Sequence, residues 1–202
     1  MSKVCYVIGA GDFLNNNINK EFDDYVICAD GGYLNAKESK LKVDLILGDF
    51  DSLSIIPDDI AIIRVSSIKD ETDTCLAIKE GIKRGYTKFV LLGCLGKRIE
   101  HSLANITLLQ TFEKYDIRIK DDDLEMFILD QNNIYEIVEK HGYVSLFSIT
   151  PTTTLSIKGL KYELENYKLT NKFPLGIDNE AIGGQATINV NKGKLLVITR
   201  FK

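Results

Sequence analysis

The stretch "VDLILGDFDS", residues 43–52, decides the fold, because it joins an uninterrupted apolar run to two closely spaced acidic residues. Apolar runs that do not alternate with polar residues are typical of strands covered on both faces, as in parallel sheets. Residues two apart on a strand point the same way. We therefore expect Asp49 and Asp51 to project together from the carboxyl end of a buried strand, where α/β sheets bind ligands. The same pattern also suits a turn that caps the next segment.

The first half of the chain alternates between further apolar runs and stretches with helical spacing. The runs are "VCYVIG" (4–9), "YVICAD" (25–30), "IAIIRVS" (60–66) and "KFVLLG" (88–93). The two convincing helical stretches are "DETDTCLAIKEGIKRGY" (70–86) and "EHSLANITLLQTFEKY" (100–115). Strands that alternate with helices predict an α/β fold class with an N-terminal sheet of the parallel type.

From about residue 124 the pattern changes to short strand-like segments separated by turn residues. The segments are "LEMFILD" (124–130), "NIYEIVE" (133–139), "YVSLFSIT" (143–150), "TTLSIKG" (153–159), "QATINVN" (185–191) and "GKLLVITR" (193–200). This second part is therefore expected to be all-β. We place the boundary near residue 130, which gives an α/β domain over 1–130 and a β domain over 131–202.

Composition restricts the classes of partner. The chain has 202 residues, of which 45% are hydrophobic, and a net charge of −4 with scattered lysines. A core of normal size is expected, and a nucleic-acid partner is not, because such surfaces are strongly basic. The apolar run near the N-terminus is too short for a signal peptide and none approaches a membrane span, so we expect no membrane partner and a cytoplasmic location. The four cysteines, Cys5, Cys28, Cys75 and Cys94, lack metal-site spacing and are expected to be buried free thiols.

A second acidic group lies in "KDETD", residues 69–73, at the start of the first convincing helix. Asp70 and Asp73 are three residues apart and share a helical face. Capping is the alternative, because carboxylates and Thr72 in a first turn satisfy free N–H groups and suit the helix dipole.

Considered together, the two acidic pairs favour a metal site. Both follow predicted strands, so they should converge on one crevice, where four carboxylates repel one another unless a cation lies among them. Ligation by carboxylate oxygens indicates Mg²⁺, which in phosphate chemistry takes one or two carboxylates and keeps several waters. The predicted metal ligands are Asp49, Asp51, Asp70 and Asp73.

The third candidate is "LLGCLGKRIEHSLAN", residues 91–105, a strand followed by a glycine-bearing loop and a helix start. Glycines let backbone amides approach an anion, and an arginine beside a helix N-terminus can hold phosphate. The alternative is that the glycines only turn the chain and that Lys97 and Arg98 are solvated. The two standard nucleotide loops are absent: "GCLGKR" lacks the spacing of a P-loop, and "GAGDFL" (9–14) has two of the three dinucleotide-binding glycines.

In combination these segments resemble the thiamine pyrophosphokinases. The resemblance rests on "ADGGYLNAKE" (29–38), "LILGDFDS" (45–52), "KDETDTCLAIKEG" (69–81), "LLGCLGKRIEHSLANI" (91–106), "GLKYEL" (159–164) and "PLGIDNEAIGGQATINVNKGKLLVI" (174–198), in that order. It implies an α/β catalytic domain that binds ATP and Mg²⁺, then a β-sandwich domain that binds thiamine. It also implies a homodimer, with thiamine at the interface between subunits.

The resemblance extends to individual residues of the nucleotide site. The family's acidic site for Mg²⁺ and phosphate matches Asp49, Asp51, Asp70 and Asp73. The family's first glycine-rich turn matches Asp30, Gly31 and Gly32. Its phosphate loop and helix match Arg98, His101 and Asn105, whereas Lys97 stands where the family pattern has glycine and Glu100 where it has aspartate. The implied catalytic set is Asp49, Asp51, Asp70, Asp73 and Arg98.

In the second domain, the family's Ser-Asn-Glu thiamine segment reads Asp178, Asn179 and Glu180. A carboxylate near the cationic thiazolium ring is physically reasonable. The implied reaction is attack of the thiamine hydroxyl on the β-phosphorus of ATP, with AMP leaving and Asp73 as first choice for the proton acceptor. Two alternatives remain: a pyrophosphokinase for another hydroxymethyl substrate such as a pterin, and a non-catalytic thiamine or nucleotide sensor.

Overall fold

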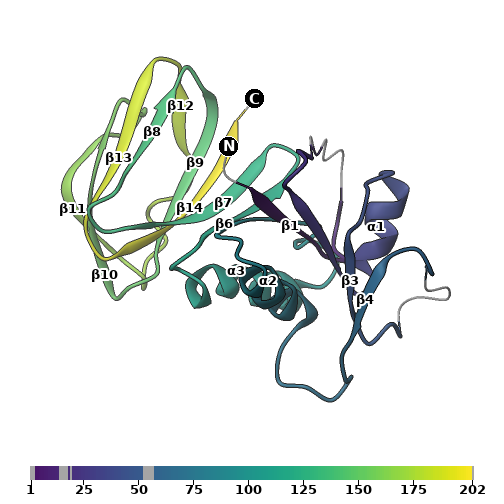
Figure 1. Cartoon of the computed structure of the whole chain (residues 1–202). Helices are drawn as coiled ribbons and strands as arrows, with labels where there is room; N and C mark the ends of the chain where they lie inside the picture. The colour runs from purple at the N-terminus through teal and green to yellow at the C-terminus, as the bar shows by residue number, and fades with distance from the viewer. Residues whose placement is uncertain (1–2, 14–17, 19, 52–56, 202) are drawn as a thin grey trace. The chain divides into compact units, whose positions relative to one another are not determined.

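The computed structural model describes residues 3–13, 18, 20–51 and 57–201, and these fall into two compact units (Figure 1). The units are Met1–Asp122 and Asp123–Lys202. The division lies before β7 (Leu124–Asp130), whereas the sequence placed it near residue 130. The reason is strand pairing: β7 pairs antiparallel with β14 (Lys194–Phe201) from Asp130 opposite Lys194 to Leu124 opposite Arg200. The strand therefore belongs with the second unit.

The first unit contains a parallel sheet, as predicted. Its strands, in the order β6-β5-β1-β2-β3-β4, are β6 (Asp116–Asp121), β5 (Lys88–Leu92), β1 (Val4–Ile8), β2 (Tyr25–Ala29), β3 (Leu45–Gly48) and β4 (Ala61–Arg64). All four residues of β3 are buried, which explains its uninterrupted apolar sequence. Strand β6 was not predicted, because only Ile117 and Ile119 of its "DIRIKD" are apolar.

Three helices connect these strands in the described part of the unit. They are α1 (Gly32–Glu38) between β2 and β3, α2 (Asp73–Lys83) between β4 and β5, and α3 (Ile99–Thr111) between β5 and β6. Helices α2 and α3 were predicted, and α1 was not. Crossovers between parallel strands are right-handed, and α1 advances the sheet in the opposite direction from α2 and α3. The helices therefore lie on both sheet faces, with α1 opposite α2 and α3 (Figure 1).

The sheet changes direction between β1 and β5. From β1 the chain builds outward through β2, β3 and β4, then returns to the other side of β1 through β5 and β6. Such a switch point leaves a crevice at the carboxyl ends of the two central strands, which is where open α/β sheets bind ligands. The loops that leave β1 and β5 are joined there, because Gly11 N donates to Gly93 O at 2.6 Å and Asp12 N to Leu95 O at 2.8 Å.

The second unit is a β-sandwich, as expected. One sheet has the order β12-β9-β14-β7, with β12 (Asn179–Ile182) and β9 (His141–Ser148) completing it. The other has the order β11-β10-β13-β8 and consists of β11 (Leu164–Thr170), β10 (Thr152–Lys158), β13 (Gln185–Lys192) and β8 (Ile134–Val138). Both sheets are antiparallel and contribute to one core, which includes Leu155, Ile188, Leu195 and Val197. The six predicted segments are all strands, and β11 and β12 are additional.

No helix among the described residues has both the length and the apolar character that crossing a membrane requires.

The four cysteines are buried and free, as predicted. Burial raises the pKa of Cys5 and of Cys94 to about 12 and raises the pKa of Cys28 and Cys75 as well. A raised thiol pKa leaves almost no thiolate at neutral pH, and the thiolate is the species that reacts.

We therefore expect iodoacetamide at pH 7.5 to modify none of the four thiols in the folded protein and all four after unfolding in guanidinium chloride. Mass spectrometry of the intact chain would count the adducts. Rapid modification of a cysteine under native conditions would show that its surroundings are more open than the structure indicates.

Candidate active site

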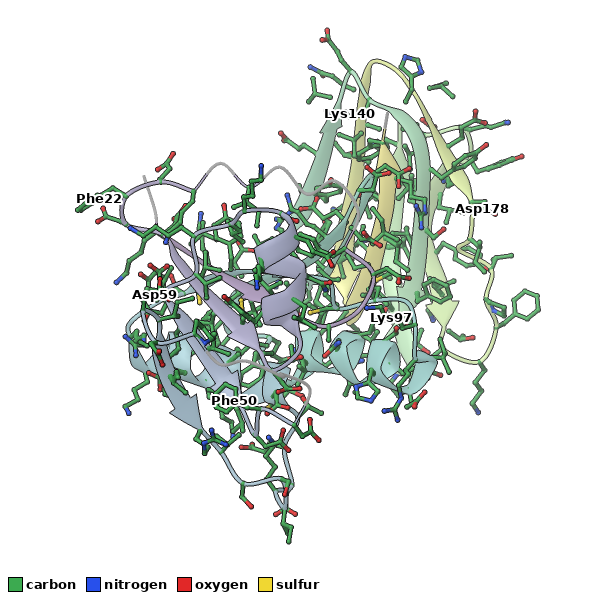
Figure 2. The ribbon with its side chains drawn as sticks, turned by 90° about the vertical axis from the view of Figure 1, so that its right-hand side faces the viewer. Phe22, Phe50, Asp59, Lys97, Lys140 and Asp178 are labelled. Carbon is green, nitrogen blue, oxygen red and sulfur yellow. The ribbon has the colours of Figure 1, made fainter. Side chains whose placement is uncertain are left out.

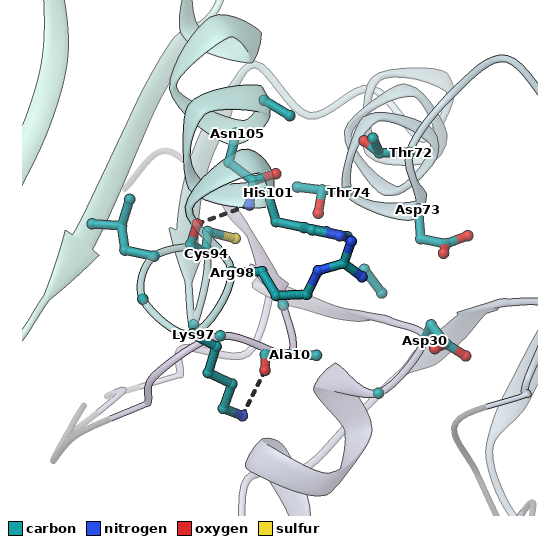
Figure 3. Close-up of a pocket in the computed structure, with 18 residues that line it drawn as sticks. Ala10, Asp30, Thr72, Asp73, Thr74, Cys94, Lys97, Arg98, His101 and Asn105 are labelled. Carbon is teal, nitrogen blue, oxygen red and sulfur yellow. Dashed lines mark hydrogen bonds between the residues drawn. The ribbon is translucent and has the colours of Figure 1, made fainter.

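A cavity of about 370 Å³ lies at the switch point, between the carboxyl ends of β1, β2 and β5 and the first turns of α2 and α3 (Figure 3). This volume is within the range of small-molecule sites. Seven predicted site residues line it, namely Asp30, Gly31, Asp73, Lys97, Arg98, His101 and Asn105. Three motifs that are far apart in the sequence therefore meet at one site.

Other predicted residues do not line this cavity, and they include Gly32, Asp70 and Glu100. Gly32 has a packing reason for its identity, because a Cβ there would lie 2.0 Å from the carbonyl oxygen of Ile8. Its lack of a side chain lets α1 approach β1.

Asp49 and Asp51 lie together, and Asp30, which lines the cavity, completes their cluster. One carboxylate oxygen from each of the three lies within 4.8 Å of the others. The pairing of Asp49 with Asp51 follows the sequence prediction, but its cause differs. Strand β3 ends at Gly48, and Phe50 has φ +66°, so a turn rather than strand alternation brings the two carboxylates together. Phe50 is directed into the core on the other side and is 5% exposed.

Asp30 enters the cluster because β2 and β3 end at the same level. The Asp30 N–H donates to Leu47 O at 2.8 Å, and a Cβ on Gly48 would lie 2.8 Å from Cβ of Asp30. The sequence carried a signal for this arrangement that the metal prediction did not use. Both strands end in aspartate, in "ICAD" and "LGD", and neighbouring parallel strands bring such ends to one edge.

Asp70 and Asp73 are outside this three-carboxylate cluster, so the four predicted aspartates do not form the expected single group. Asp70 is exposed. Asp73 is the first residue of α2, forms an ion pair with Lys69, and lines the cavity on the side where Asp30 lies (Figure 3). The difference arises because α2 begins beyond the sheet edge at which β2 and β3 end.

The chemistry of the three-carboxylate cluster fits a hard divalent cation. Its donors are all carboxylate oxygens, which is the ligand type that Mg²⁺ takes in proteins. Three like charges at this spacing repel one another, and a cation among them removes that cost. Asp30, Asp49 and Asp51 are thus the residues that could hold a metal.

The loop after β5 presents Arg98 to the cavity. Gly93, Gly96 and Lys97 have positive φ of 61°, 78° and 48°, which turns the chain sharply. Figure 3 shows Arg98 pointing into the cavity and Lys97 pointing away, where its Nζ donates to the carbonyl of Ala10 at 2.7 Å. The two residues of the basic pair therefore have different positions relative to a ligand.

Two residues of α3, Asn105 in its middle and Glu100 in its first turn, support this loop. Asn105 is buried and its Nδ2 donates to Cys94 O at 2.8 Å, so its amide holds the turn (Figure 3). Glu100 pairs with Arg98 at 2.6 Å, and its own backbone N–H together with Arg98 lowers the pKa of its carboxyl. His101 lines the cavity with an exposed side chain.

In the second unit, the side-chain amide of Asn179 is engaged by backbone groups. Its Oδ1 accepts from the Tyr162 N–H at 3.0 Å and its Nδ2 donates to Tyr162 O at 2.7 Å. Glu180 forms an ion pair with Lys161 at 2.6 Å and thereby raises the pKa of that lysine. Asp178 is exposed just before β12 and has φ +57° (Figure 2). Of the three predicted thiamine residues, Asp178 and Glu180 offer carboxylates at the surface.

Sequence reasoning missed several residues at the cavity. They are Gly9, Ala10 and Gly11 from the loop after β1, and Thr72 and Thr74 at the start of α2. The available signal was "GAG" directly after the first strand. This motif lacks the third glycine of a dinucleotide fingerprint, but its position after a strand at the switch point is itself a signal for a ligand-binding loop.

The fold and the site define a class: a doubly wound α/β unit with a cavity at its switch point and a carboxylate cluster, followed by a β-sandwich. Two family models match this chain. "Thiamin pyrophosphokinase, catalytic domain" matches residues 17–120 and "Thiamin pyrophosphokinase, vitamin B1 binding domain" matches residues 131–195. The chain belongs to the thiamin pyrophosphokinase family.

Individual relatives agree with this assignment. A thiamine pyrophosphokinase of Bacillus subtilis is 32% identical over 135 residues, which cover 64% of this chain and 63% of that protein. The crystal structure of thiamine pyrophosphokinase from Bacillus subtilis has a TM-score of 0.87 at 23% identity, covering 98% of this chain and 99% of the other. A family protein from Enterococcus faecalis has a TM-score of 0.83 at 28% identity, with coverage of 98% and 99%. The fold is thus shared over nearly the whole length.

The three-carboxylate cluster can be tested by metal titration. We expect Asp30→Asn and Asp51→Asn each to weaken binding of Mn²⁺, followed by electron paramagnetic resonance, by about tenfold or more, because each removes one anionic ligand. Asp70→Asn should change binding much less, since Asp70 is outside the cluster. Asp23→Asn, at an exposed position on another loop, is the matched control. Wild-type affinity in Asp30→Asn would contradict the cluster.

Proposed function

We propose that this protein is a thiamine diphosphokinase that transfers the diphosphate of ATP to the hydroxyl of thiamine, releasing AMP. The observation that carries the proposal is the cavity at the switch point, with Arg98 on one side and Asp30 and Asp73 on the other. Membership of the family in both domains supports the choice of thiamine as acceptor. The proposal places the reaction in the cytoplasm, whose reducing conditions suit four free thiols.

In this proposal the triphosphate of ATP occupies the cavity. The guanidinium of Arg98, the residue before the first turn of α3, supplies hydrogen bonds to phosphate oxygens. Asp30, Asp49 and Asp51 would hold Mg²⁺, and Asp73 lines the same cavity as Asp30. When bound, the metal ion neutralises charge on the phosphates and fixes their orientation. The protein then contributes mainly positioning, which is what phosphoryl transfer requires.

Asp73 is the candidate to accept the proton of the thiamine hydroxyl. Asp30 and Asp73 are the two carboxylates among the described residues that line the cavity, and Asp30 is committed to the metal cluster. The ion pair with Lys69 holds the Asp73 carboxylate at the start of α2. A general base must reach the proton that it removes, and this placement leaves Asp73 available for that role.

The thiamine site is proposed to lie on the β-sandwich near Asp178 and Glu180, at the interface of a homodimer. Tyr143 is opposite Glu180 in the pairing of β9 with β12, and Ile182 lies two residues further on the same face. Tyr143 and Ile182 are 52% and 58% exposed. Exposed apolar side chains beside carboxylates fit a face that binds a cationic aromatic ring and a second subunit.

The other readings are less well supported. A pyrophosphokinase for a pterin would not need a match to a vitamin B1 binding domain. A non-catalytic sensor would not need three carboxylates within 4.8 Å of one another, because like charges at this spacing repel one another.

The product identifies the reaction. With ATP labelled in the γ-phosphate, thiamine and Mg²⁺, we expect the label in thiamine diphosphate and unlabelled AMP in equal amount, because the β and γ groups transfer together. Omitting thiamine, or removing the metal with EDTA, should stop AMP formation. Label in thiamine monophosphate with ADP as co-product would contradict the proposed transfer, and so would AMP formation with a pterin but not with thiamine.

The dimer can be tested with a pair of variants of equal exposure. We expect Ile182→Lys to shift the protein from dimer to monomer in sedimentation at micromolar concentration, because it places a charge in the proposed interface. Ile134, on β8 of the other sheet, is also 58% exposed, and Ile134→Lys should leave the dimer intact. A wild-type protein that sediments only as a monomer would exclude a thiamine site built from two subunits.

A further inference from the structure

The loop of Gly9, Ala10 and Gly11, called here the glycine loop, has a side-chain donor on each of its carbonyls. Nδ2 of Asn35 donates to Gly9 O at 2.8 Å and to Gly11 O at 3.1 Å. Nζ of Lys97 donates to Ala10 O at 2.7 Å. Two side chains, one from α1 and one from the loop after β5, thus hold all three carbonyl groups.

The N–H groups of the glycine loop are arranged differently. Gly9 N donates to Leu92 O at 2.8 Å and Gly11 N to Gly93 O at 2.6 Å. Within the described residues, no acceptor takes the N–H of Ala10, although Ala10 lines the cavity. For an anionic ligand this division is favourable, because an N–H attracts phosphate and a carbonyl oxygen repels it.

Lys97 has a backbone conformation that is unfavourable for a lysine. Its φ of +48° is in the left-handed region, where residues other than glycine, asparagine and aspartate are uncommon. The hydrogen bond to Ala10 gives this conformation a compensating contact, and it directs the Lys97 side chain away from the cavity while Arg98 enters it (Figure 3).

We propose that Asn35 and Lys97 are positioning residues that hold the carbonyls of the glycine loop away from the nucleotide phosphates, so that Arg98 is the member of the basic pair that contacts them. This inference rests on the proposed binding of ATP in the cavity. It assigns a role to Asn35, which no sequence motif singled out as a site residue, and to a lysine that stands where the family pattern has glycine.

A double-mutant cycle tests the inference. Affinity for the non-hydrolysable analogue α,β-methylene-ATP with Mg²⁺ is measured by calorimetry for wild type, Asn35→Ser, Lys97→Met and the double variant. Each single change should weaken binding about fivefold, the scale of one or two lost hydrogen bonds. The double variant should be weakened by clearly less than the product of the two factors, because either change alone releases the same loop. Lys97→Arg, which keeps the donor, should restore most of the affinity.

Two further measurements separate positioning from other roles. In steady-state kinetics the single variants should raise the KM for ATP while kcat changes less than about twofold, because the reacting groups themselves are retained. The loss in Lys97→Met should be insensitive to salt, whereas a direct phosphate contact would weaken with ionic strength. Lys83→Met, at a lysine side chain that is 82% exposed on α2, is the control for loss of a positive charge.

Several results would overturn the inference. They are additive losses in the cycle, a salt-dependent loss for Lys97→Met, and unchanged nucleotide affinity with only a lower Tm in Asn35→Ser. If the wild type binds the nucleotide and the variants bind it with the same affinity, this inference alone is overturned. A wild-type protein that does not bind the nucleotide would overturn the proposed function as well.

Discussion

The close contact between the loops after β1 and β5 is the constraint on which the site depends. A Cβ on Gly9 would lie 2.6 Å from Gly93 O, and a Cβ on Gly11 would lie 2.2 Å from Leu95 O. Because both neighbours are backbone atoms, no rotation of a side chain could relieve such a contact, and an alanine would force the two loops apart. The cavity walls contributed by β1 and β5 would then separate. The switch point is therefore built from residues that have no side chain.

The secondary structure was largely predictable, because it is encoded locally. Uninterrupted apolar runs identified β1 to β5, and apolar spacing with Thr72 as a cap identified α2. The failures were β6, β11 and β12, whose apolar residues are few or interrupted, and α1, which is only seven residues long. Such elements are specified mainly by the neighbours with which they pair, and a single sequence does not display those neighbours.

The candidate site was predictable as a set of motifs but not as a geometry. The sequence identified Asp49 with Asp51 and the loop that carries Arg98. It could not decide which further carboxylates join the pair, because that depends on where neighbouring strands end. Asp30 joins since β2 and β3 end together, whereas Asp73 begins a helix beyond that edge. Asn179 illustrates a related limit: a polar side chain that suggests a ligand contact instead satisfies backbone groups that a turn leaves open.

In the proposed function, the charges around the cavity make the nucleotide and the metal bind together. Arg98 supplies one positive charge to a triphosphate, while Asp30, Asp49, Asp51 and Asp73 place negative charge beside it. A triphosphate alone would be repelled by these carboxylates, and a divalent cation alone would lack the phosphate oxygens that complete its ligand set. Binding of the cation therefore reduces the charge repulsion that opposes binding of the triphosphate, and binding of the triphosphate supplies the oxygens that the cation lacks. By linkage such a coupling is reciprocal, so in the proposed function the carboxylates that disfavour free ATP would be the groups that make the site selective for its complex with a metal.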